Sequence, residues 1–206
     1  MIVFLDFDGV LHSFTERHVQ PYHDLQRLEA VLREYPAVSV VVSSSQREEK
    51  SLDELRAPFS PDIAPRVVGV TPVIPIDGAA DLPGSRYREI LLYLDEHPAR
   101  HWVALDDDET LFPPTCPNLI LCDDGFNAFA AMELQTRLKA AVIDSVPVIE
   151  RNGRPFAVRL DDIPEPYRSE FRKALLGSTI PVPENGHDLA FVWDWKRFIT
   201  RVPRWF

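Results

Sequence analysis

Two acidic residues separated by a single position follow the first apolar run of the chain. Residues 2–5 are all apolar, and Asp6 and Asp8 come directly after them. An unbroken apolar run is typical of a central parallel strand that is covered on both faces. Side chains two residues apart on an extended segment share a face, so Asp6 and Asp8 are expected to bring two negative charges together. A cation or a proton must compensate them, and Mg²⁺ is the obvious cation.

A second apolar run, at 102–106, also ends in acids. Asp106, Asp107 and Asp108 stand in succession, with Glu109 after them. A single aspartate after a strand is usually a turn or cap residue. Three of them, after a strand expected to lie beside the first one, are typical of hard oxygen ligands for Mg²⁺.

Hydroxyl groups follow a third apolar run, at 38–43. Ser43, Ser44 and Ser45 stand at its end. A hydroxyl between a strand end and a helix N-terminus can bind a phosphate oxygen, helped by free backbone N–H groups and the helix dipole. The alternative is a capping box, with Ser45 as the N-cap and Glu48 reaching back to it. Both interpretations remain open, because three serines are present and only one need cap.

A cation stands near the start of a predicted helix. Ser85 is a plausible N-cap, which places Arg86 in the first helical turn. A positive charge there opposes the helix dipole, so the local cost suggests a use outside the helix. The alternative is an ordinary surface arginine, since Arg88 lies two residues on.

Strand and helix patterns alternate through the first two thirds of the chain. The predicted strands are 2–6, 38–43, 66–70, 102–106 and 119–122. Three segments between or after them have apolar residues at near-helical spacing: Leu25, Leu28, Val31, Leu32 and Tyr35; Tyr87, Ile90, Leu91 and Leu94; and Phe126, Phe129, Leu134 and Leu138. This alternation predicts an α/β fold, a Rossmann-like parallel sheet with helices on both faces. Ligands bind beyond the carboxyl ends of such strands, where the polar residues lie.

The pattern changes after residue 147. Residues 148–160 read as two extended segments around Asn152-Gly153, a strong hairpin signal. A helix is predicted over 164–176, and 189–199 is rich in Trp and Phe. We therefore expect two domains, 1–147 and a small α+β appendage at 148–206.

Bulk composition sets broad limits. The 206 residues include 32 Asp and Glu against 22 Lys and Arg, a net charge of −10, which argues against broad electrostatic capture of nucleic acid or of an anionic membrane. No apolar stretch is long enough to span a bilayer and no signal peptide is apparent, so a cytoplasmic location and no membrane partner are expected. Cys116 and Cys122 lack CxxC spacing and are expected to be reduced.

Over about residues 1–143 the chain resembles the haloacid dehalogenase-like (HAD) superfamily of phosphohydrolases. The resemblance rests on Asp6-x-Asp8-Gly9-Val10 and on Leu105-Asp106-Asp107, with Ser43 and Arg86 in the expected order between them. It implies a Mg²⁺-dependent phosphatase that hydrolyses a phosphate monoester through an aspartyl-phosphate.

The resemblance also implies roles for single residues. Asp6 would be the nucleophile and Asp8 the general acid and then base. Ser43 or Ser44 would hold a phosphoryl oxygen, with Gly9 also at the substrate, and Arg86 would neutralise charge in place of the more usual lysine. The set Asp6, Asp8, Asp106 and Asp107 would hold the metal. Chemistry agrees, because an Asp nucleophile can attack a dianionic monoester only with a divalent cation and a positive side chain nearby.

Substrate choice stays open. Neither spacer in the first domain holds an obvious cap, so we expect a phosphorylated small molecule or a phosphorylated nucleic-acid end, closed in by the appendage or by a second copy in a homodimer. The N-terminal half also resembles the compact domains of this superfamily in polyfunctional RNA-repair proteins, which implies a nucleic-acid terminal phosphate. Another class is a catalytically idle binding or regulatory module, with Trp193, Trp195, Phe198, Trp205 and Phe206 as a partner surface; intact acids argue against it. The histidines His12, His18 and His23 read as loop residues.

Overall fold

The computed structural model describes residues 1–13, 21–123, 125–175 and 188–201. The chain forms two compact units, Met1–Leu138 and Lys139–Phe206. Their boundary falls within one helix, α4 (Ala128–Ser145). The predicted division into domains 1–147 and 148–206 stays a prediction, and each unit is described by itself.

A five-stranded parallel sheet forms the centre of the first unit. Its strands are β1 (Ile2–Leu5), β2 (Ser39–Val42), β3 (Val67–Val70), β4 (Trp102–Asp106) and β5 (Leu119–Leu121). The order is β3-β2-β1-β4-β5, and every neighbouring pair is parallel. The chain therefore starts in the middle strand, where both neighbours bring side chains to the residues that follow Leu5.

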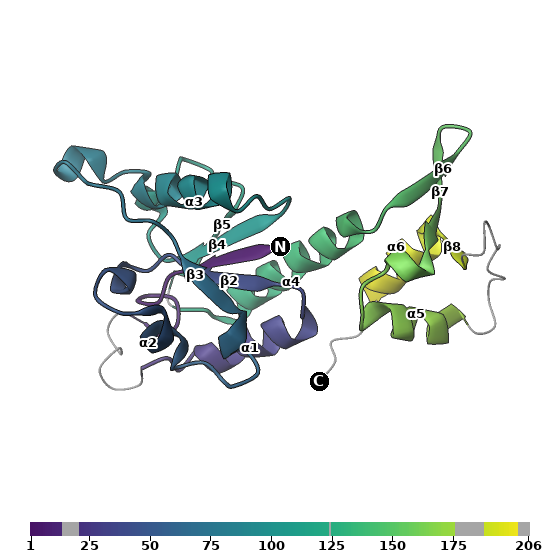
Figure 1. Ribbon diagram of the computed structural model, residues 1–206, viewed down its shortest axis with the longest axis horizontal. Helices are drawn as coiled ribbons and strands as arrows, with labels where there is room; N and C mark the ends of the chain where they lie inside the picture. The colour runs from purple at the N-terminus through teal and green to yellow at the C-terminus, as the bar shows by residue number, and fades with distance from the viewer. Residues whose placement is uncertain (14–20, 124, 176–187, 202–206) are drawn as a thin grey trace. The chain divides into compact units, whose positions relative to one another are not determined.

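Helices cover both faces of this sheet, as Figure 1 shows with α3 on one side and α1 on the other. The helices of the first unit are α1 (Leu25–Glu34), α2 (Leu52–Arg56), α3 (Ser85–Glu96) and the start of α4, with short 3₁₀ turns η1 (Ser45–Glu48), η2 (Ala64–Arg66), η3 (Ala79–Asp81) and η4 (Glu109–Leu111). The architecture confirms the predicted Rossmann-like α/β fold.

Alternate strand residues point to opposite faces, and one set builds the core beneath α3. Phe4, Val41 and Ala104 come from the three central strands and pack with Ile90 of α3 and with Phe112. All five side chains are at most 4% exposed. Residues two positions further along these strands therefore face the same side as α3.

Two of the predicted helical stripes are only partly correct. Leu91 is 41% exposed although Ile90 beside it is buried, and Phe129 is 77% exposed. The third stripe is wrong at Phe129 because α4 begins only at Ala128. At this start the Asn127 side chain accepts hydrogen bonds from the backbone N–H groups of Phe129 and Ala130. Phe126 lies before the helix and is fully buried. The rotation of the helix then turns Phe129 outward.

The predicted helix caps also need correction. Ser44, not Ser45, caps η1, and its side-chain oxygen accepts from the backbone N–H of Gln46. Glu48 is not part of a capping box there; that motif lies at the start of α2, between Ser51 and Glu54. Helix α3 is preceded by Gly84 with φ 71°, so Ser85 is its first residue rather than its N-cap.

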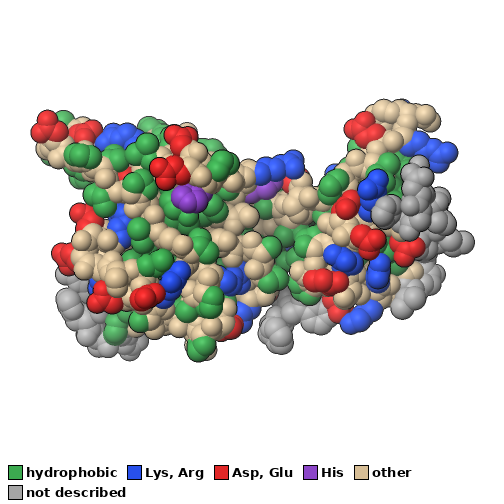
Figure 2. Space-filling view, viewed as in Figure 1, with side chains coloured by type: hydrophobic (Ala, Val, Ile, Leu, Met, Phe, Trp, Pro, Cys, Tyr) green, Lys and Arg blue, Asp and Glu red, His purple; other side chains and the backbone are tan. Residues whose placement is uncertain are grey.

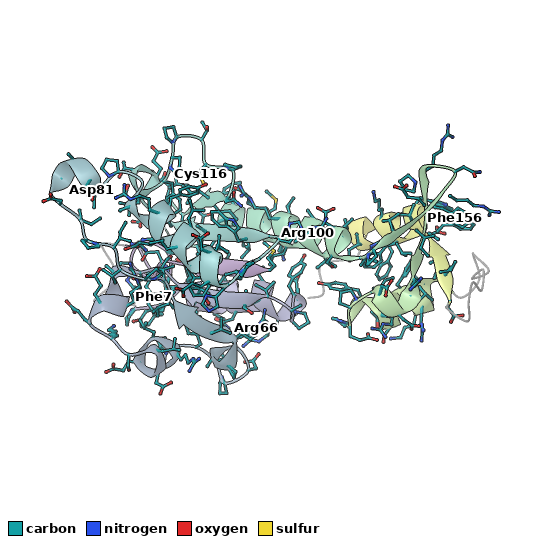
Figure 3. The ribbon with its side chains drawn as sticks, turned by 45° about the horizontal axis from the view of Figure 1, so that its top comes forward. Phe7, Arg66, Asp81, Arg100, Cys116 and Phe156 are labelled. Carbon is teal, nitrogen blue, oxygen red and sulfur yellow. The ribbon has the colours of Figure 1, made fainter. Side chains whose placement is uncertain are left out.

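One arginine ties the end of α1 to the start of β2. Arg66, labelled in Figure 3, donates hydrogen bonds to the backbone carbonyls of Leu32, Tyr35 and Val38 at 2.7 to 2.9 Å. The last carbonyls of a helix have no partner within the helix. The guanidinium group supplies partners for two of these carbonyls and keeps α1 against the strand that it precedes.

The second unit contains a three-stranded antiparallel sheet and two helices. Its elements are β6 (Val148–Arg151), β7 (Arg154–Arg159), η5 (Leu160–Asp162), α5 (Tyr167–Leu175), β8 (Leu189–Phe191) and α6 (Val192–Arg201), with the sheet in the order β6-β7-β8. Asn152 and Gly153 both have positive φ, 53° and 70°, as a two-residue hairpin turn requires. The predicted hairpin and the small α+β appendage are confirmed.

This unit has its own apolar core. Trp195 is 1% exposed and packs in one cluster with Phe171, Val158 and other buried side chains from α5, α6 and the sheet. Trp193 is instead 55% exposed. Phe198 is half-buried and packs against the same cluster. The other two aromatics of the predicted partner surface, Trp205 and Phe206, lie outside the described residues.

The surface carries charged side chains of both signs, scattered over the face that Figure 2 shows. None of the helices in the described ranges is long and apolar enough to cross a membrane.

Candidate active site

The register of the sheet brings three predicted site residues into one row. Leu5 of β1 pairs with Val42 of β2 on one side and with Leu105 of β4 on the other. The next residues along these strands are Asp6, Ser43 and Asp106. Backbone hydrogen bonds continue to this level, since the Asp6 N–H donates to Leu105 at 3.0 Å and the Ser43 N–H donates to Leu5 at 2.9 Å. The row stands at the carboxyl edge of the sheet, on the side of α3.

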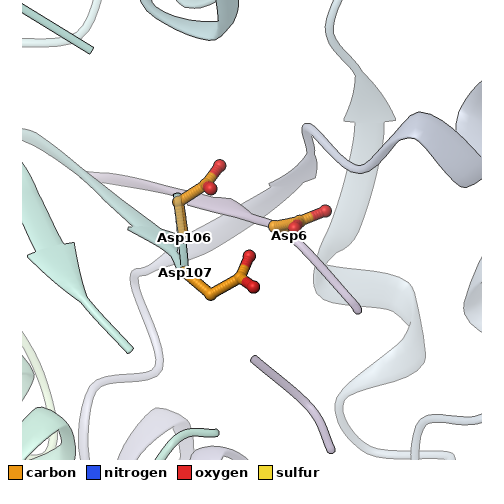
Figure 4. Close-up of side chains that lie close together, drawn as sticks. All are labelled: Asp6, Asp106 and Asp107. Carbon is orange, nitrogen blue, oxygen red and sulfur yellow. The ribbon is translucent and has the colours of Figure 1, made fainter. Parts of the chain in front are cut away.

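Three carboxyl groups converge at this edge. Asp6, Asp106 and Asp107 each offer one oxygen, and these oxygens all lie within 4.8 Å of one another. Figure 4 shows the three side chains turned toward a common space. Asp6 and Asp106 are buried and Asp107 is exposed, so the cluster opens to solvent on one side only. Asp8 is not a member of this cluster.

Arg86 is the cation beside these carboxylates. Its Nη1 lies 3.5 Å from Asp6 Oδ1 and 3.7 Å from Asp106 Oδ2, and the same atom donates to the backbone carbonyl of Ser43. The residue lies in the first turn of α3 and is 8% exposed. The guanidinium group, at a position that opposes its own helix dipole, thus lies at the sheet edge.

Two further residues hold Arg86 and the serine loop in place, and the sequence analysis missed both. Glu89 Oε2 lies 3.8 Å from Arg86 Nε and 2.6 Å from Arg47 Nη2. Arg47 also donates to the carbonyls of Ser43 and Ser44 at 2.9 and 2.8 Å. The spacing of Arg86 and Glu89, three positions apart on one helix face, was the available signal.

Burial and crowding shift the titration of the cluster. The pKa of Asp6 is raised, chiefly by burial, against the opposing effects of Arg86 and a hydrogen bond from Ser44. The pKa of Asp106 is raised to about 8 by burial and then by the negative charge of Asp6. The pKa of Asp107 is raised by the same two causes, in the same order. One arginine is therefore too little positive charge for three carboxylates.

The cluster meets the requirements of a magnesium site. Its donors are carboxylate oxygens, the ligands that Mg²⁺ prefers. Asp106 Oδ2 is buried and has no hydrogen-bond partner among the described residues. A buried carboxylate oxygen without a hydrogen-bond partner is costly even with Arg86 3.7 Å away, and a bound cation removes that cost. Asp6, Asp106 and Asp107 are thus the residues that would hold the ion.

The two candidate serines differ in what their hydroxyl groups do. Ser44 Oγ accepts a hydrogen bond from the Gln46 N–H at 3.4 Å, and its hydroxyl donates to Asp6. Ser43 Oγ is buried and has no hydrogen-bond partner in the described part of the chain. Ser43 therefore has the hydroxyl that is uncommitted at the sheet edge, whereas Ser44 orients Asp6 and caps η1.

Asp8 occupies a separate position, where two side chains contact its carboxyl group. Gln46 Nε2 donates to Asp8 Oδ2 at 2.8 Å, and His12 Nε2 lies 3.2 Å from Asp8 Oδ1. His12 lies in the turn after β1 and is 3% exposed. His23 Nε2 lies 3.1 Å from Asp24 Oδ2, and His18 falls outside the described residues.

Gly9 has a conformational role at the site. Its φ is 78°, in the left-handed region that favours glycine, and a Cβ atom at this position would overlap the carboxyl group of Asp107. The first turn after β1 can thus pass close to the carboxylate cluster only with glycine. Its predicted part in substrate binding stays a prediction.

A buried thiol lies just behind the cluster. Cys122 follows β5, is fully buried, and donates its backbone N–H to the carbonyl of Asp106 at 2.9 Å. Burial raises the pKa of its thiol, and the charges of Asp106 and Asp107 raise it further. Cys122 and Cys116 are both free.

Comparison with known families gives one match. A family model described as the HAD domain in Swiss Army Knife RNA repair proteins matches residues 2–131. The chain belongs to this family. Comparisons with curated proteins and with solved structures give no match.

The HAD domain assignment confirms the resemblance carried by the first motif and by the aspartate pair at the end of β4. Its matched range contains the whole carboxylate cluster, both serines and Arg86, and it ends within the first turn of α4. HAD membership supports hydrolase activity of the phosphatase type and use of a divalent metal as general properties. The match does not extend over the second unit.

Proposed function

We propose that the protein is a Mg²⁺-dependent phosphatase that removes a terminal phosphate monoester from a nucleic-acid end through an aspartyl-phosphate on Asp6. The observation that carries this proposal is the position of Asp6, which is buried with its carboxyl group beside those of Asp106 and Asp107 and 3.5 Å from Arg86. An aspartate with a purely structural role would not need two further carboxyl groups and an arginine beside its own carboxyl group. Clustered perturbed acids are typical of catalytic sites.

The two chemical steps follow from the acids. An oxygen of Asp6 attacks phosphorus, and the bond from phosphorus to the ester oxygen breaks. The carboxyl group of Asp8 donates its proton to the leaving ester oxygen. In the second step Asp8 takes a proton from water, the water oxygen attacks phosphorus, and the bond to Asp6 breaks. Inorganic phosphate leaves, and both acids return to their starting states.

The remaining residues manage charge. A bound Mg²⁺ supplies positive charge that lets an anionic nucleophile approach a dianionic ester. Arg86 neutralises charge beside Asp6 and Asp106, and the hydroxyl of Ser43 donates to a phosphoryl oxygen. Asp106 and Asp107 hold the metal and Ser44 orients the nucleophile. Asp8 as a fourth metal residue is not needed in this scheme.

The family description supports a nucleic-acid end over a small metabolite, because it names RNA repair proteins. The acidic charge weighs the other way at the site itself, since it lies in the first unit, where 11 Lys and Arg face 23 Asp and Glu, whereas residues 139–206 have 11 against 9. A phosphorylated small molecule remains the second candidate. A cytoplasmic location and a homodimer stay predictions.

The deciding experiment compares substrates and one isosteric change. Oligonucleotides with a 3′- or a 5′-phosphate and a panel of phosphorylated metabolites are assayed with Mg²⁺ and with a chelator. We expect turnover of one oligonucleotide class, dependent on Mg²⁺ and lost in Asp6→Asn. The matched control is Asp123→Asn, an exposed acid beyond β5, which should keep wild-type activity. A folded Asp6→Asn protein with wild-type turnover would disprove the nucleophile, and exclusive turnover of metabolites would disprove the substrate class.

A further inference from the structure

We infer that His12 and Gln46 are positioning residues that clamp the Asp8 carboxyl group in the orientation needed for proton transfer to the leaving oxygen. This inference rests on the proposed function, since it concerns the acid and base of the same reaction. We refer to this pair as the Asp8 clamp. Neither residue belongs to the motifs that carry the family resemblance.

The clamp occupies both oxygens of Asp8. His12 Nε2 lies 3.2 Å from Oδ1, and Gln46 Nε2 donates to Oδ2 at 2.8 Å. Both partners follow Asp8 in the sequence, one from the turn after β1 and one from η1 after β2. A carboxyl group held at both oxygens cannot rotate about its Cβ–Cγ bond without breaking a hydrogen bond.

A backbone contact fixes which nitrogen of His12 carries the proton. The backbone N–H of Tyr22 donates to His12 Nδ1 at 3.3 Å, so Nδ1 must present its lone pair. In the neutral ring the proton is then on Nε2, which makes His12 a donor to Asp8. A ring protonated at both nitrogens would set two N–H groups against each other at Tyr22.

The conformation of Tyr22 is unusual and serves this contact. Its φ is 62°, in the left-handed region that bulky residues rarely adopt. The Tyr22 ring also makes edge contacts with His12 and Phe7, at centroid distances of 5.5 and 6.0 Å. Strained backbone that aims one N–H at a buried imidazole is characteristic of functional sites.

Gln46 is oriented in a comparable way. Lys50 Nζ donates to Gln46 Oε1 at 2.7 Å, so the amide oxygen faces the lysine and the amide nitrogen faces Asp8. The Gln46 backbone N–H is held by Ser44 Oγ. Each donor of the clamp therefore has a second contact that fixes its direction, as positioning by a supporting layer of residues requires.

The alternative is that His12 is only a satisfied polar residue in a buried turn. The two interpretations differ in one measurable quantity. A purely structural residue changes stability or lowers all rates together. Loss of a residue that orients the general acid lowers the rate most for esters with a poor leaving group. Only for such esters does protonation of the leaving oxygen limit the rate.

The test is therefore a leaving-group series of phosphate monoesters with Mg²⁺, from nitrophenyl esters to alkyl esters. His12→Leu and Gln46→Met remove the donors with similar side-chain size. We expect each to lower kcat/KM about 10- to 100-fold for alkyl esters and less than about threefold for nitrophenyl esters, within the range of general acid catalysis. His12→Gln should retain most activity, since its amide nitrogen reaches the position of Nε2. The control is His101→Leu, a histidine just before β4 at the opposite edge of the sheet.

Two further measurements keep the inference open to disproof. In an Asp8→Asn background, His12→Leu should cause no additional loss, because the acid it orients is absent; a further tenfold loss would contradict the clamp. Should His12→Leu fail to fold, Gln46→Met carries the same comparison. Equal loss across the series would overturn the inference while leaving the phosphatase proposal intact.

The protonation state of the ring can be read without any activity. In the ¹⁵N NMR spectrum of the wild-type protein we expect the neutral His12 ring as the Nε2–H tautomer. An Nδ1–H tautomer would overturn the clamp even if no ester proved to be a substrate. A protein inactive on every phosphate ester with Mg²⁺ would instead overturn the proposed function.

Discussion

The neighbouring residues Ser43 and Ser44 differ in the hydrogen bonds that their hydroxyl groups make. Ser44 is committed to Asp6 and to the N-terminus of η1, whereas the Ser43 hydroxyl is buried with no partner among the described residues. An unsatisfied hydroxyl costs stability, and a lost cap costs about 0.5–2 kcal/mol. The roles of Ser43 and Ser44 can therefore be distinguished by measuring both stability and activity for a variant of each serine.

We predict that Ser43→Ala lowers phosphatase activity at least tenfold without lowering the free energy of unfolding. Ser44→Ala should lower that free energy by about 1 kcal/mol, because a cap is lost. Urea unfolding and assays of kcat/KM on the two variants provide the check. Destabilisation by Ser43→Ala, or unchanged activity, would show that Ser43 is only a packing residue.

The carboxylate cluster predicts an unusual pH dependence for the metal-free protein. A carboxyl group whose pKa is raised on folding binds its proton more tightly in the native state, so stability is lost as pH rises through that pKa. Asp6, Asp107 and Asp106 are all raised, the last to about 8. We expect the free energy of unfolding in a chelator to fall between about pH 5 and pH 8.

Magnesium should reverse this fall, because it binds the ionised carboxylates and only the native state assembles them. The increase in melting temperature on adding Mg²⁺ is therefore expected to be larger at about pH 8 than at about pH 5. The pKa values of Glu54 and Asp62 are lowered, so these groups change the free energy of unfolding only below the range from about pH 5 to pH 8. Equal Mg²⁺ effects at both pH values, or none, would argue against the site.

Single residues were predictable here where chemistry follows a strand in the sequence. Asp6, Ser43 and the aspartate pair at the end of β4 were singled out in this way, and Arg86 was singled out at the start of a predicted helix. His12, Gln46, Arg47 and Glu89 were not, because their importance comes from partners that the fold brings to them. Gln46 lies 38 positions from Asp8, so no local pattern marks the pair.

At the scale of elements, the turn after β1 is the most constrained segment of the site. It must leave the central strand, pass the Asp107 carboxyl group and present Asp8 to its two partners. Gly9 makes this path accessible through its positive φ. Alanine there would meet both a conformational cost and the side chain of Asp107.

We predict that Gly9→Ala lowers activity by about 100-fold, as expected of a site displaced by about 1 Å. Affinity for Mg²⁺ should fall as well, because Asp107 must move. Isothermal titration with Mg²⁺ and steady-state assays would measure the two effects. Gly153→Ala is a useful comparison, since Gly153 also has positive φ but lies in the hairpin of the second unit. Unchanged metal affinity in Gly9→Ala would contradict the role assigned to this glycine.

Strands were more predictable than helix faces. Buried parallel strands are unbroken apolar runs bounded by polar residues, so their positions and the sheet follow from the sequence. The third helix stripe failed at Phe129 because its phase depends on where the helix begins. Asn127 sets that start, and the stripe was counted from Phe126, which precedes it.

At the scale of the whole molecule, two compact units with separate apolar cores share one continuous helix. The core of the second unit combines Val146, directly after α4, with side chains of α5 and α6, and Val142 and Ile143 of α4 pack against it. Composition could predict that the appendage exists but not that α4 supplies part of its core. The expectation that the appendage closes the catalytic mouth stays a prediction.

We predict that Trp195→Ala lowers the free energy of unfolding of the second unit by about 3–5 kcal/mol, the usual cost of removing a large buried side chain. Trp193→Ala is the matched control, since that side chain is 55% exposed and should change stability by less than about 0.5 kcal/mol. Urea unfolding of both variants in the full chain gives the comparison. Similar losses in the two would contradict the assigned core.

The reactivity of the buried Cys122 thiol can report how often the catalytic edge of the sheet opens. A buried thiol with a raised pKa reacts with a disulfide reagent only while the sheet edge is open, so its labelling rate measures how often that edge opens. Half-buried Cys116 should react first and serve as an internal reference. Mass spectrometry should show Mg²⁺ slowing the reaction of Cys122 alone. Equal rates for both thiols, unaffected by Mg²⁺, would mean that the catalytic edge is open most of the time.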